Sequence, residues 1–247
     1  MTGSSGNAAL LFGAGDAIGA AVARRVAQGG LKVCIVRRDP AKSAALIAEI
    51  EAAGGEAHAY GVDVRDEAQV TALFEEVERD VGPVDLCLFN AGANVGKPVH
   101  ETSADLFEKA WILACRSGFV VGREATRRMV GRGRGVMLFT GATASVKGRT
   151  GFAAFASAKF ALRGMAQAMA RELGPKGVHV AHLVIDAGIN SAAIHERMRK
   201  AGKDVAAIPE GSLVETSSVA EAYWFLYSQP RDGWTHELDL RPSVEVW

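Results

Sequence analysis

The chain has 247 residues, of which 49% are hydrophobic, and its 28 Lys and Arg balance 28 Asp and Glu. This length suits one α/β domain with a large core. The zero net charge argues against a nucleic-acid partner, because a surface that follows phosphates needs an excess of cations. The chain holds no apolar run of membrane-spanning length, and its first residues lack the character of a signal peptide. We therefore expect a cytoplasmic protein without a membrane partner.

Cysteines, histidines and the main basic cluster have ordinary structural explanations. Cys34, Cys87 and Cys115 lie in apolar surroundings, which indicates reduced core thiols rather than a disulfide framework. His179 and His182 are three apart in an apolar run, so on a strand they point to opposite faces and cannot share a metal. We expect no metal site. The cluster of arginines between residues 127 and 134 is interpreted as a solvated helix end and turn.

Residues 8–19 predict a phosphate-binding turn between a strand and a helix. The apolar run Ala8–Phe12 stops at glycines, and apolar residues then recur with helical spacing. Gly13 and Gly15 allow a sharp turn and a close approach to a ligand, whereas Gly19 allows close packing of helix and strand. A helix that begins there offers free N–H groups and a positive dipole end to an anion.

The same alternation of apolar strand and amphipathic helix continues to the end of the chain. Further strands are expected over 31–36, 57–62, 84–89, 135–140, 178–185 and 236–240, and further helices over 40–53, 66–80, 103–130, 151–173 and 217–227. Strands that are apolar on both faces require helices on both sides of a parallel sheet. The sequence therefore predicts an α/β fold, a Rossmann-type doubly wound parallel sheet in one three-layer domain. The charged segment 191–212 interrupts the alternation and is expected to form a flexible flap.

Five short motifs occur in order, namely the glycine loop Gly13–Gly19, Asp63-Val64, Asn90-Ala91-Gly92, Phe155–Lys159 and Ala187-Gly188-Ile189. Their order and spacing resemble the short-chain dehydrogenase/reductase family, and the resemblance covers almost the whole chain. It implies one NAD(P)-binding domain over residues 1–247. It also implies the cofactor contacts Gly13, Gly15, Asp16, Ile18, Gly19, Asp63, Val64, Asn90, Ala91, Gly92, Lys159, Gly188 and Ile189.

The residues at the end of the second strand indicate whether the chain prefers NAD(H) or NADP(H). An acidic residue there would hold both ribose hydroxyls of NAD. This chain has Arg37 and Arg38 instead, and guanidinium groups suit a 2′-phosphate. We therefore expect both arginines to bind cofactor, with NADP(H) preferred over NAD(H).

The resemblance fails at the catalytic positions. The family tyrosine, serine and asparagine map onto Phe155, Ala142 and Cys115, and only the lysine is kept, as Lys159. A phenyl ring has no ionisable proton, Ala142 has no donor, and a thiol is a weak one. Two hypotheses stay open. One is an NADP(H)-dependent oxidoreductase with a degenerate active site, acting on an unidentified carbonyl or alcohol. The other is a catalytically inactive nucleotide-binding homologue that acts as a cofactor sensor or partner subunit.

Several other side chains are candidates to replace the lost groups. Hydroxyls lie nearby in the sequence, at Thr140, Thr143, Ser145, Thr150 and Ser157, but they are poor unaided acids and more often cap helices or turns. His195 in the flap and Asp186 after the sixth strand are titratable candidates of lesser weight.

The flap and two long helices lead to expectations about partners. Apolar residues in the flap indicate a small-molecule substrate of apolar character. The family resemblance implies that the helix before the fifth strand and the lysine-bearing helix pair with their copies, so we expect a homodimer or homotetramer.

Overall fold

Seven strands form the central sheet in the computed structural model, which describes residues 6–92, 94–202 and 204–244. The order is β3-β2-β1-β4-β5-β6-β9, and every neighbouring pair is parallel. The strands are β1 (Ala8–Phe12), β2 (Lys32–Arg37), β3 (Ala57–Gly61), β4 (Val84–Phe89), β5 (Gly135–Thr140), β6 (Val178–Ile185) and β9 (Glu237–Leu240). The predicted doubly wound, three-layer α/β fold is confirmed, and the predicted strand ends differ from these by at most one residue.

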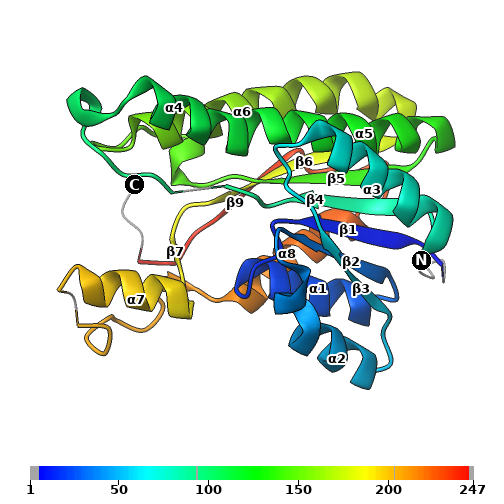
Figure 1. The fold of residues 1–247 in the computed structure, drawn as a ribbon, viewed down its shortest axis with the longest axis horizontal. Helices are drawn as coiled ribbons and strands as arrows, with labels where there is room; N and C mark the ends of the chain where they lie inside the picture. The colour runs from blue at the N-terminus through cyan, green and yellow to red at the C-terminus, as the bar shows by residue number, and fades with distance from the viewer. Residues whose placement is uncertain (1–5, 93, 203, 245–247) are drawn as a thin grey trace.

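Helices cover both faces of the sheet (Figure 1). One face packs against α1 (Ile18–Gln28), α2 (Ala44–Ala52) and α8 (Thr216–Ser228), and the other against α3 (Glu67–Asp80), α5 (Ser117–Arg132) and α6 (Ala153–Leu173). The short helix α4 (Ala104–Trp111) packs on α6. Alternate residues of β1 enter the two cores, since Leu10 faces the α3, α5 and α6 side while Leu11 faces the α1 and α8 side. All eight residues of β6 are buried, as a strand covered on both faces requires.

The predicted long helix over 103–130 is interrupted. Between α4 and α5, residues Ile112–Arg116 form a π-helical turn, and the Ser117 hydroxyl donates a hydrogen bond of 2.9 Å to the Ile112 carbonyl oxygen there. An extra residue in a turn shifts the register of the side chains that follow. Cys115 lies within this turn and is buried.

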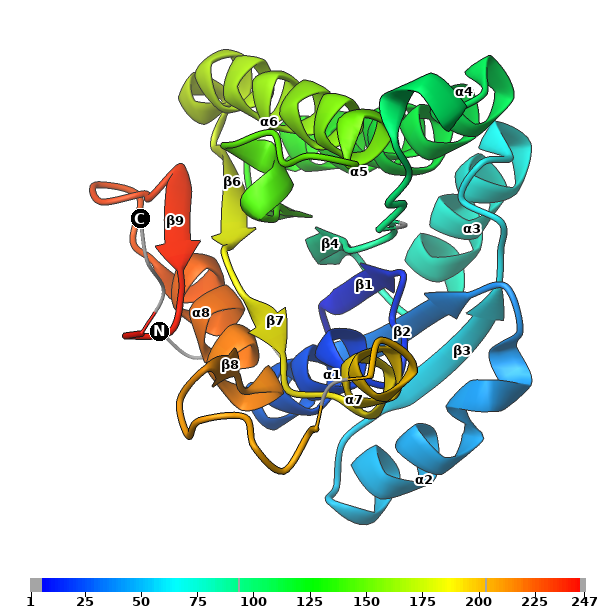
Figure 2. The ribbon, with the colours of Figure 1, turned by 90° about the vertical axis from the view of Figure 1, so that its left-hand side faces the viewer.

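The expected flap contains regular structure. Residues Gly188–Ile189 form β7, which pairs with β8 (Leu213–Val214) outside the main sheet. The helix α7 (Ala192–Lys200) lies between these two strands in the sequence. The Ser191 hydroxyl caps α7 by accepting a hydrogen bond from the Ile194 N–H. Figures 1 and 2 show α7 beyond the carboxyl ends of the strands, apart from the sheet.

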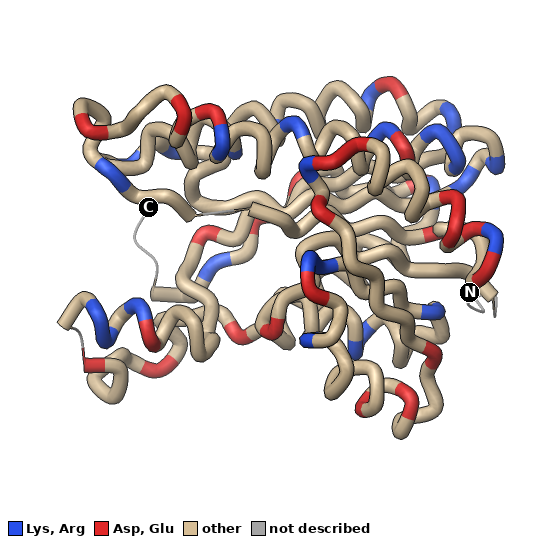
Figure 3. The backbone as a smooth tube through the Cα atoms, viewed as in Figure 1, with Lys and Arg blue, Asp and Glu red and all other residues tan. Residues whose placement is uncertain are grey.

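The arginines of residues 127–134 lie at the end of α5 and in the turn after it, as interpreted, but only Arg127 and Arg134 are well solvated, with side chains 66% and 49% exposed. Arg128 pairs with the buried Glu124 at 2.9 Å, and Arg132 pairs with Glu78 at 2.7 Å. Figure 3 shows acidic and basic residues interspersed over the elements, which agrees with the zero net charge.

Candidate functional site

The glycine loop after β1 is shaped by close contacts between backbones. Gly13 has φ +74°, and a Cβ there would lie 2.6 Å from the Ala91 nitrogen, so no larger residue fits. A Cβ on Gly19 would lie 2.3 Å from the Ala14 Cα. A Cβ on Gly15, in contrast, would meet no atom within 4 Å. The first two glycines therefore serve the turn and the packing, and the third keeps the approach to the loop open.

The start of α1 offers an anion site at this loop. Its N-cap residue, Ala17, makes no side-chain cap, and its first turn contains no acidic residue. Uncapped N–H groups and the helix dipole favour a negative charge there. The loop also lies between β1 and β4, where the strand order reverses, and Asn90 after β4 donates a hydrogen bond of 3.0 Å to the Gly13 carbonyl oxygen. Ligands of open α/β sheets bind at such a reversal.

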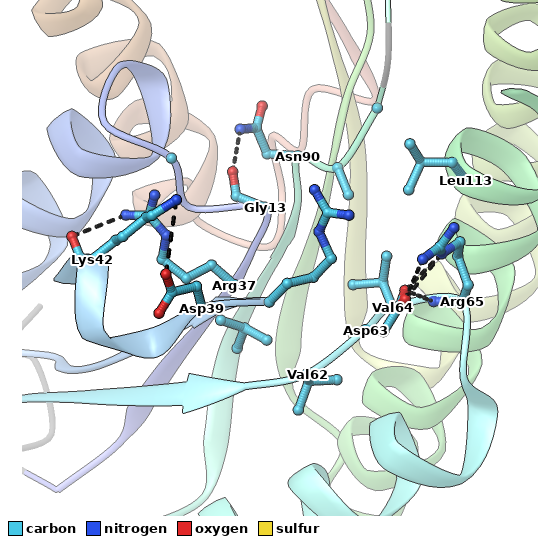
Figure 4. A pocket seen from close by; sticks show the side chains of 15 residues that line it. Gly13, Arg37, Asp39, Lys42, Val62, Asp63, Val64, Arg65, Asn90 and Leu113 are labelled. Carbon is cyan, nitrogen blue, oxygen red and sulfur yellow. Dashed lines mark hydrogen bonds and ion pairs between the residues drawn. The ribbon is translucent and has the colours of Figure 1, made fainter.

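A cavity of about 370 Å³ extends from the loop over the ends of β2 and β3. Its charged lining residues are Arg37, Arg38, Asp39, Lys42, Asp63 and Arg65 (Figure 4). The four cations outnumber the two acids, so this end of the cleft favours an anion.

The three arginines of this cavity differ in the hydrogen bonds and ion pairs that their side chains make. Arg37 donates hydrogen bonds to Asp16 at 2.9 Å and to the Lys42 carbonyl oxygen at 3.2 Å. Arg65 forms a bidentate pair with Asp63, and its hydrogen bond lowers the pKa of that carboxyl to about 2. Arg38 is exposed and has no hydrogen-bond or ion-pair partner among the described residues. It is therefore the cation most available to a ligand.

A second cavity, of about 680 Å³, continues from the first, since Asn90 and Gly92 line both. Its walls come from the segment after β5, the start of α6, β7 and α7, and include Ala142, Phe155, Lys159, Gly188 and Ile189. The two cavities together form one cleft along the carboxyl ends of the strands.

Lys159 is the buried cation of this second cavity. Its side chain is only 5% exposed in relative terms, and Nζ donates a hydrogen bond of 2.7 Å to the Thr140 carbonyl oxygen. Burial lowers the pKa of Lys159 to about 8. The ring centre of Phe155, one helical turn earlier, lies 5.9 Å from Nζ. The lysine therefore faces an aromatic ring where a hydroxyl would lie in a tyrosine.

Comparisons with known proteins agree with this geometry. The family model described as short chain dehydrogenase matches residues 7–203. A short-chain dehydrogenase/reductase of Armillaria gallica is 32% identical over 180 residues, 72% of this chain and 69% of that protein. This chain belongs to the short-chain dehydrogenase family. The family comprises oxidoreductases that bind a nicotinamide cofactor.

Two solved structures extend the similarity to nearly the full length. A short-chain dehydrogenase from Rhodopseudomonas palustris is 45% identical, with 96% of this chain and 99% of that chain covered at a TM-score of 0.82. A metagenomic short-chain oxidoreductase in complex with NADP is 25% identical, with 98% and 99% covered at a TM-score of 0.81. Among the described residues, no helix is long and apolar enough to cross a membrane.

Most residues that the family motifs assign to the cofactor line the cleft. The first cavity contains Gly13, Gly15, Arg37, Arg38, Asp63, Val64, Asn90, Ala91 and Gly92, and the second contains Ile18, Lys159, Gly188 and Ile189. Gly19 lines neither cavity and packs on Ala14. Asp16 is not on the wall of either cavity but orients Arg37.

Of the three positions onto which the family's tyrosine, serine and asparagine map, two line the second cavity and one does not. Phe155 and Ala142 line the second cavity beside Lys159, whereas Cys115 lines neither cavity. Burial also raises the pKa of the Cys115 thiol. The cavity wall is therefore apolar at the two positions onto which the sequence resemblance maps the family tyrosine and serine.

The nearby hydroxyls are engaged in structural hydrogen bonds. Thr140 Oγ1 lies 2.6 Å from the hydroxyl of the buried Tyr223, and Thr143 donates to Asp186 at 2.5 Å. Ser145 accepts from the Ala142 N–H, and Ser157 donates to the Ala153 carbonyl oxygen. Only Thr140 and Thr143 of the five candidates line the cavity, and neither hydroxyl is without a partner.

The remaining titratable candidates also lie off the cavity wall. Asp186 is buried, accepts the Thr143 hydrogen bond and forms ion pairs with Lys147 and Arg241. His195 lies on α7 but does not line either cavity. His179 stacks on Trp234, and no group of three or more His, Cys, Asp or Glu among the described residues has the geometry of a metal site.

Sequence reasoning missed several residues of the cleft. Arg65 and Lys42 add positive charge to the first cavity, and Lys147, Arg149 and Arg197 add it to the second. The position of Arg65, two residues after Asp63, was the one local signal for such a pair. The other cations come together only when the chain is folded.

Proposed function

We propose that this protein is an NADP(H)-dependent oxidoreductase with an altered active site, acting on a carbonyl or alcohol. The observation that carries the proposal is the buried Lys159, which faces a cavity continuous with the nucleotide cleft. The nicotinamide, when bound, supplies or accepts the hydride at the substrate carbon. The second cavity, of about 680 Å³, is also lined by Phe152, Ile194 and Met198, which no cofactor motif includes, and this part of the wall leaves a place for a substrate.

The residues of the first cavity fit a phosphorylated adenosine. Arg38 has no partner among the described residues, and Arg37 is fixed by Asp16 at the rim. Guanidinium groups bind phosphate through paired, charge-assisted hydrogen bonds. The similar metagenomic oxidoreductase was solved with NADP, which supports the same preference in this chain. The start of α1 would hold the diphosphate.

Lys159 is the group that we assign to the reacting oxygen. In the reducing direction the carbonyl carbon gains a hydride and its oxygen gains a proton. The Lys159 ammonium, with a pKa lowered to about 8, is matched to donating that proton near neutral pH. Phe155 and Ala142 then exclude water from the site without taking part in the proton transfer.

The second candidate is a nucleotide-binding homologue without turnover. The apolar Phe155 and Ala142 beside Lys159, and the engaged Thr140 and Thr143 hydroxyls, favour it. In this case the cofactor cleft would report nucleotide occupancy to a partner.

Two measurements on the native protein separate these candidates. NADPH at a hundred times its dissociation constant should raise the free energy of unfolding by about 2.7 kcal/mol, seen as a shift in thermal melts. NADPH oxidation is then followed with a panel of quinones, diketones and aldehydes. Binding with turnover supports the oxidoreductase, binding without turnover supports the inactive homologue, and no binding contradicts both.

We also propose a homodimer or homotetramer assembled through the helices α4, α5 and α6. Their outer faces carry large apolar side chains that are 39–48% exposed, namely Phe107, Trp111, Phe119 and Phe160. Light scattering at micromolar concentration should give a multiple of the 26.0 kDa chain mass, and a monomer mass would contradict the proposal. The cytoplasmic location and the single domain over 1–247 remain predictions.

A further inference from the structure

The charged side chains that line the second cavity all carry the same sign. Among the described residues on its wall they are Lys147, Arg149, Lys159 and Arg197, with no Asp or Glu. The chain as a whole balances 28 cations with 28 acids, so this wall differs from the average of the molecule. A concave site lined by one sign of charge concentrates ligands of the opposite charge.

The four cations are not equally available to a ligand. Lys147 forms an ion pair with Asp186 at 3.6 Å, and Lys159 is buried and donates a hydrogen bond to the Thr140 carbonyl oxygen. Arg149 and Arg197 are exposed, and their side chains have no hydrogen-bond or ion-pair partner among the described residues. These two arginines are therefore the groups free to hold an anion.

The position of Arg197 on α7 is specific. The cavity is lined by Ile194, Arg197 and Met198 of α7 and by Ala201, which directly follows the helix, and their spacings of three and four place them on one face. Their neighbours Arg199 and Lys200 lie off this face, where both pair with Glu196. The inward face of α7 thus presents one guanidinium among apolar side chains.

Arg149 belongs to a different wall. It lies in the segment between β5 and α6, close in sequence to Phe152, which also lines the cavity. Figure 1 shows α6 and α7 on opposite sides of the space beyond the strand ends. A ligand in this cavity can therefore meet apolar side chains, an arginine from each of two walls, and the buried Lys159.

We infer that the substrate of this cavity is an organic anion with an apolar body, whose anionic group binds Arg149 and Arg197 and whose reacting carbonyl or alcohol lies at Lys159. The inference rests on the proposed function, because it takes the cavity beside Lys159 as the substrate site. It replaces the earlier expectation of a merely apolar ligand with an amphipathic one. The charge also sets the orientation of the substrate, since the anionic end is held away from the reacting end.

Two probes of one shape test the inference without requiring turnover. The probes 4-phenylbutanoate and 4-phenylbutanamide differ by one charge. Both are titrated calorimetrically into NADPH-saturated protein at low ionic strength, where screening is weak. Charge-assisted hydrogen bonds are about twice as strong as neutral ones, so we expect the acid to bind at least about tenfold more tightly than the amide.

Matched variants identify the residues responsible. The double substitution Arg149→Gln with Arg197→Gln should reduce binding of the acid to that of the amide. The control Arg199→Gln removes a charge from the outer side of the same helix and should leave the preference intact. All variants should keep the native melting temperature and the native NADPH affinity.

Several outcomes would overturn the inference. They are equal binding of acid and amide, no binding of the acid, a preference for the acid that survives in the double variant, or a loss of NADPH affinity in that variant, which would assign the arginines to the cofactor. A failure of native protein to bind NADPH would instead contradict the proposed function. The comparison of acid and amide on the protein alone would then still decide the present inference.

Discussion

The two ends of the cleft differ in how strongly the packing of the fold restricts which residues can occupy them. At the cofactor end, Gly13 and Gly19 have no room for a side chain, because a Cβ would meet backbone atoms at 2.6 and 2.3 Å. A substitution there would strain the turn and the packing of α1 on the sheet. At the substrate end, Phe155 and Ala142 differ from tyrosine and serine by single oxygen atoms at a cavity wall. The fold tolerates these changes.

If the family tyrosine and serine correspond to Phe155 and Ala142, as the sequence resemblance implies, this difference would let a chain keep the family fold and cleft without the family's acid. The glycine loop is required by folding as well as by the cofactor, so a substitution of Gly13 or Gly19 would lower the stability of the fold. The hydroxyls of the active site are required only by chemistry. The comparison also shows where function can be restored, since the substrate end can gain oxygens with almost no change in shape.

The largest expected effect comes from restoring both groups by Phe155→Tyr with Ala142→Ser. Lys159 stands one helical turn from residue 155, with Nζ 5.9 Å from the ring centre, so its charge would lower the pKa of the new phenol. Acid catalysis and one oxyanion donor together should raise carbonyl reduction by about three to seven orders of magnitude over a negligible baseline. NADPH oxidation with the aldehyde, diketone and quinone panel measures it.

Phe152→Tyr is the matched control for this experiment. Phe152 also lines the cavity, but it lies seven residues before Lys159 and precedes α6. A tyrosine there should not raise turnover. If the native protein turns over and the double substitution lowers that rate, Phe155 and Ala142 belong to a working site of another kind.

The fold could be predicted because its central strands are largely apolar and buried. Uniform burial of β6 and the alternation of strands with amphipathic helices leave only a parallel sheet covered on both faces. The π turn at Ile112–Arg116 could not be predicted. The apolar pattern continues through it, and the Ser117 hydroxyl bond that accompanies it has no distinct sequence signal.

The cleft was predicted at its motifs and missed where distant charges meet. The glycine turn was predicted from its residues, and Asn90 was predicted from the family resemblance. Outside the cleft, the pairing of Arg132 with Glu78, 54 residues away, was missed because the two residues meet only in the folded chain. The same limit applies to Arg149 and Arg197, which reach one cavity from separate walls. Long-range ion pairs and shared cavities depend on three-dimensional packing. Hydrophobic periodicity predicts helices and strands but does not predict which charged side chains meet.

A second prediction concerns the stability cost of the buried Lys159 in cofactor-free protein. Its pKa is lowered from 10.5 to about 8 by burial. Below pH 8 both folded and unfolded chains carry the charge, and burial then costs the folded state about 3 kcal/mol. Between pH 8 and 10.5 only the unfolded chain keeps the proton, so this cost falls as the pH rises.

Lys159→Met should therefore stabilise the cofactor-free protein at pH 7. The lost hydrogen bond to Thr140 subtracts about 1 kcal/mol, which leaves a gain of about 2 kcal/mol. Urea unfolding at pH 7 and pH 10 measures it, and the gain should shrink at the higher pH. Lys200→Met, at a side chain 76% exposed, should show neither effect. A destabilised Lys159→Met protein at pH 7 would mean that the lysine is not buried as a charge.

The smallest effect tests the other end of the cleft, where Arg38 should distinguish the two nicotinamide cofactors. A 2′-phosphate that binds its guanidinium gains a contact that NADH lacks. Arg38→Ala should therefore weaken NADPH binding about tenfold, near 1.4 kcal/mol, and leave NADH binding unchanged. Arg37→Ala is the comparison, because Asp16 and the Lys42 carbonyl oxygen already engage that side chain, so its removal should cost less. Fluorescence titration with each cofactor at the same ionic strength gives the four affinities. Native protein that binds NADH as tightly as NADPH would contradict the preference, and an equal loss of both cofactors in Arg38→Ala would place its contact on a part of the cofactor that they share.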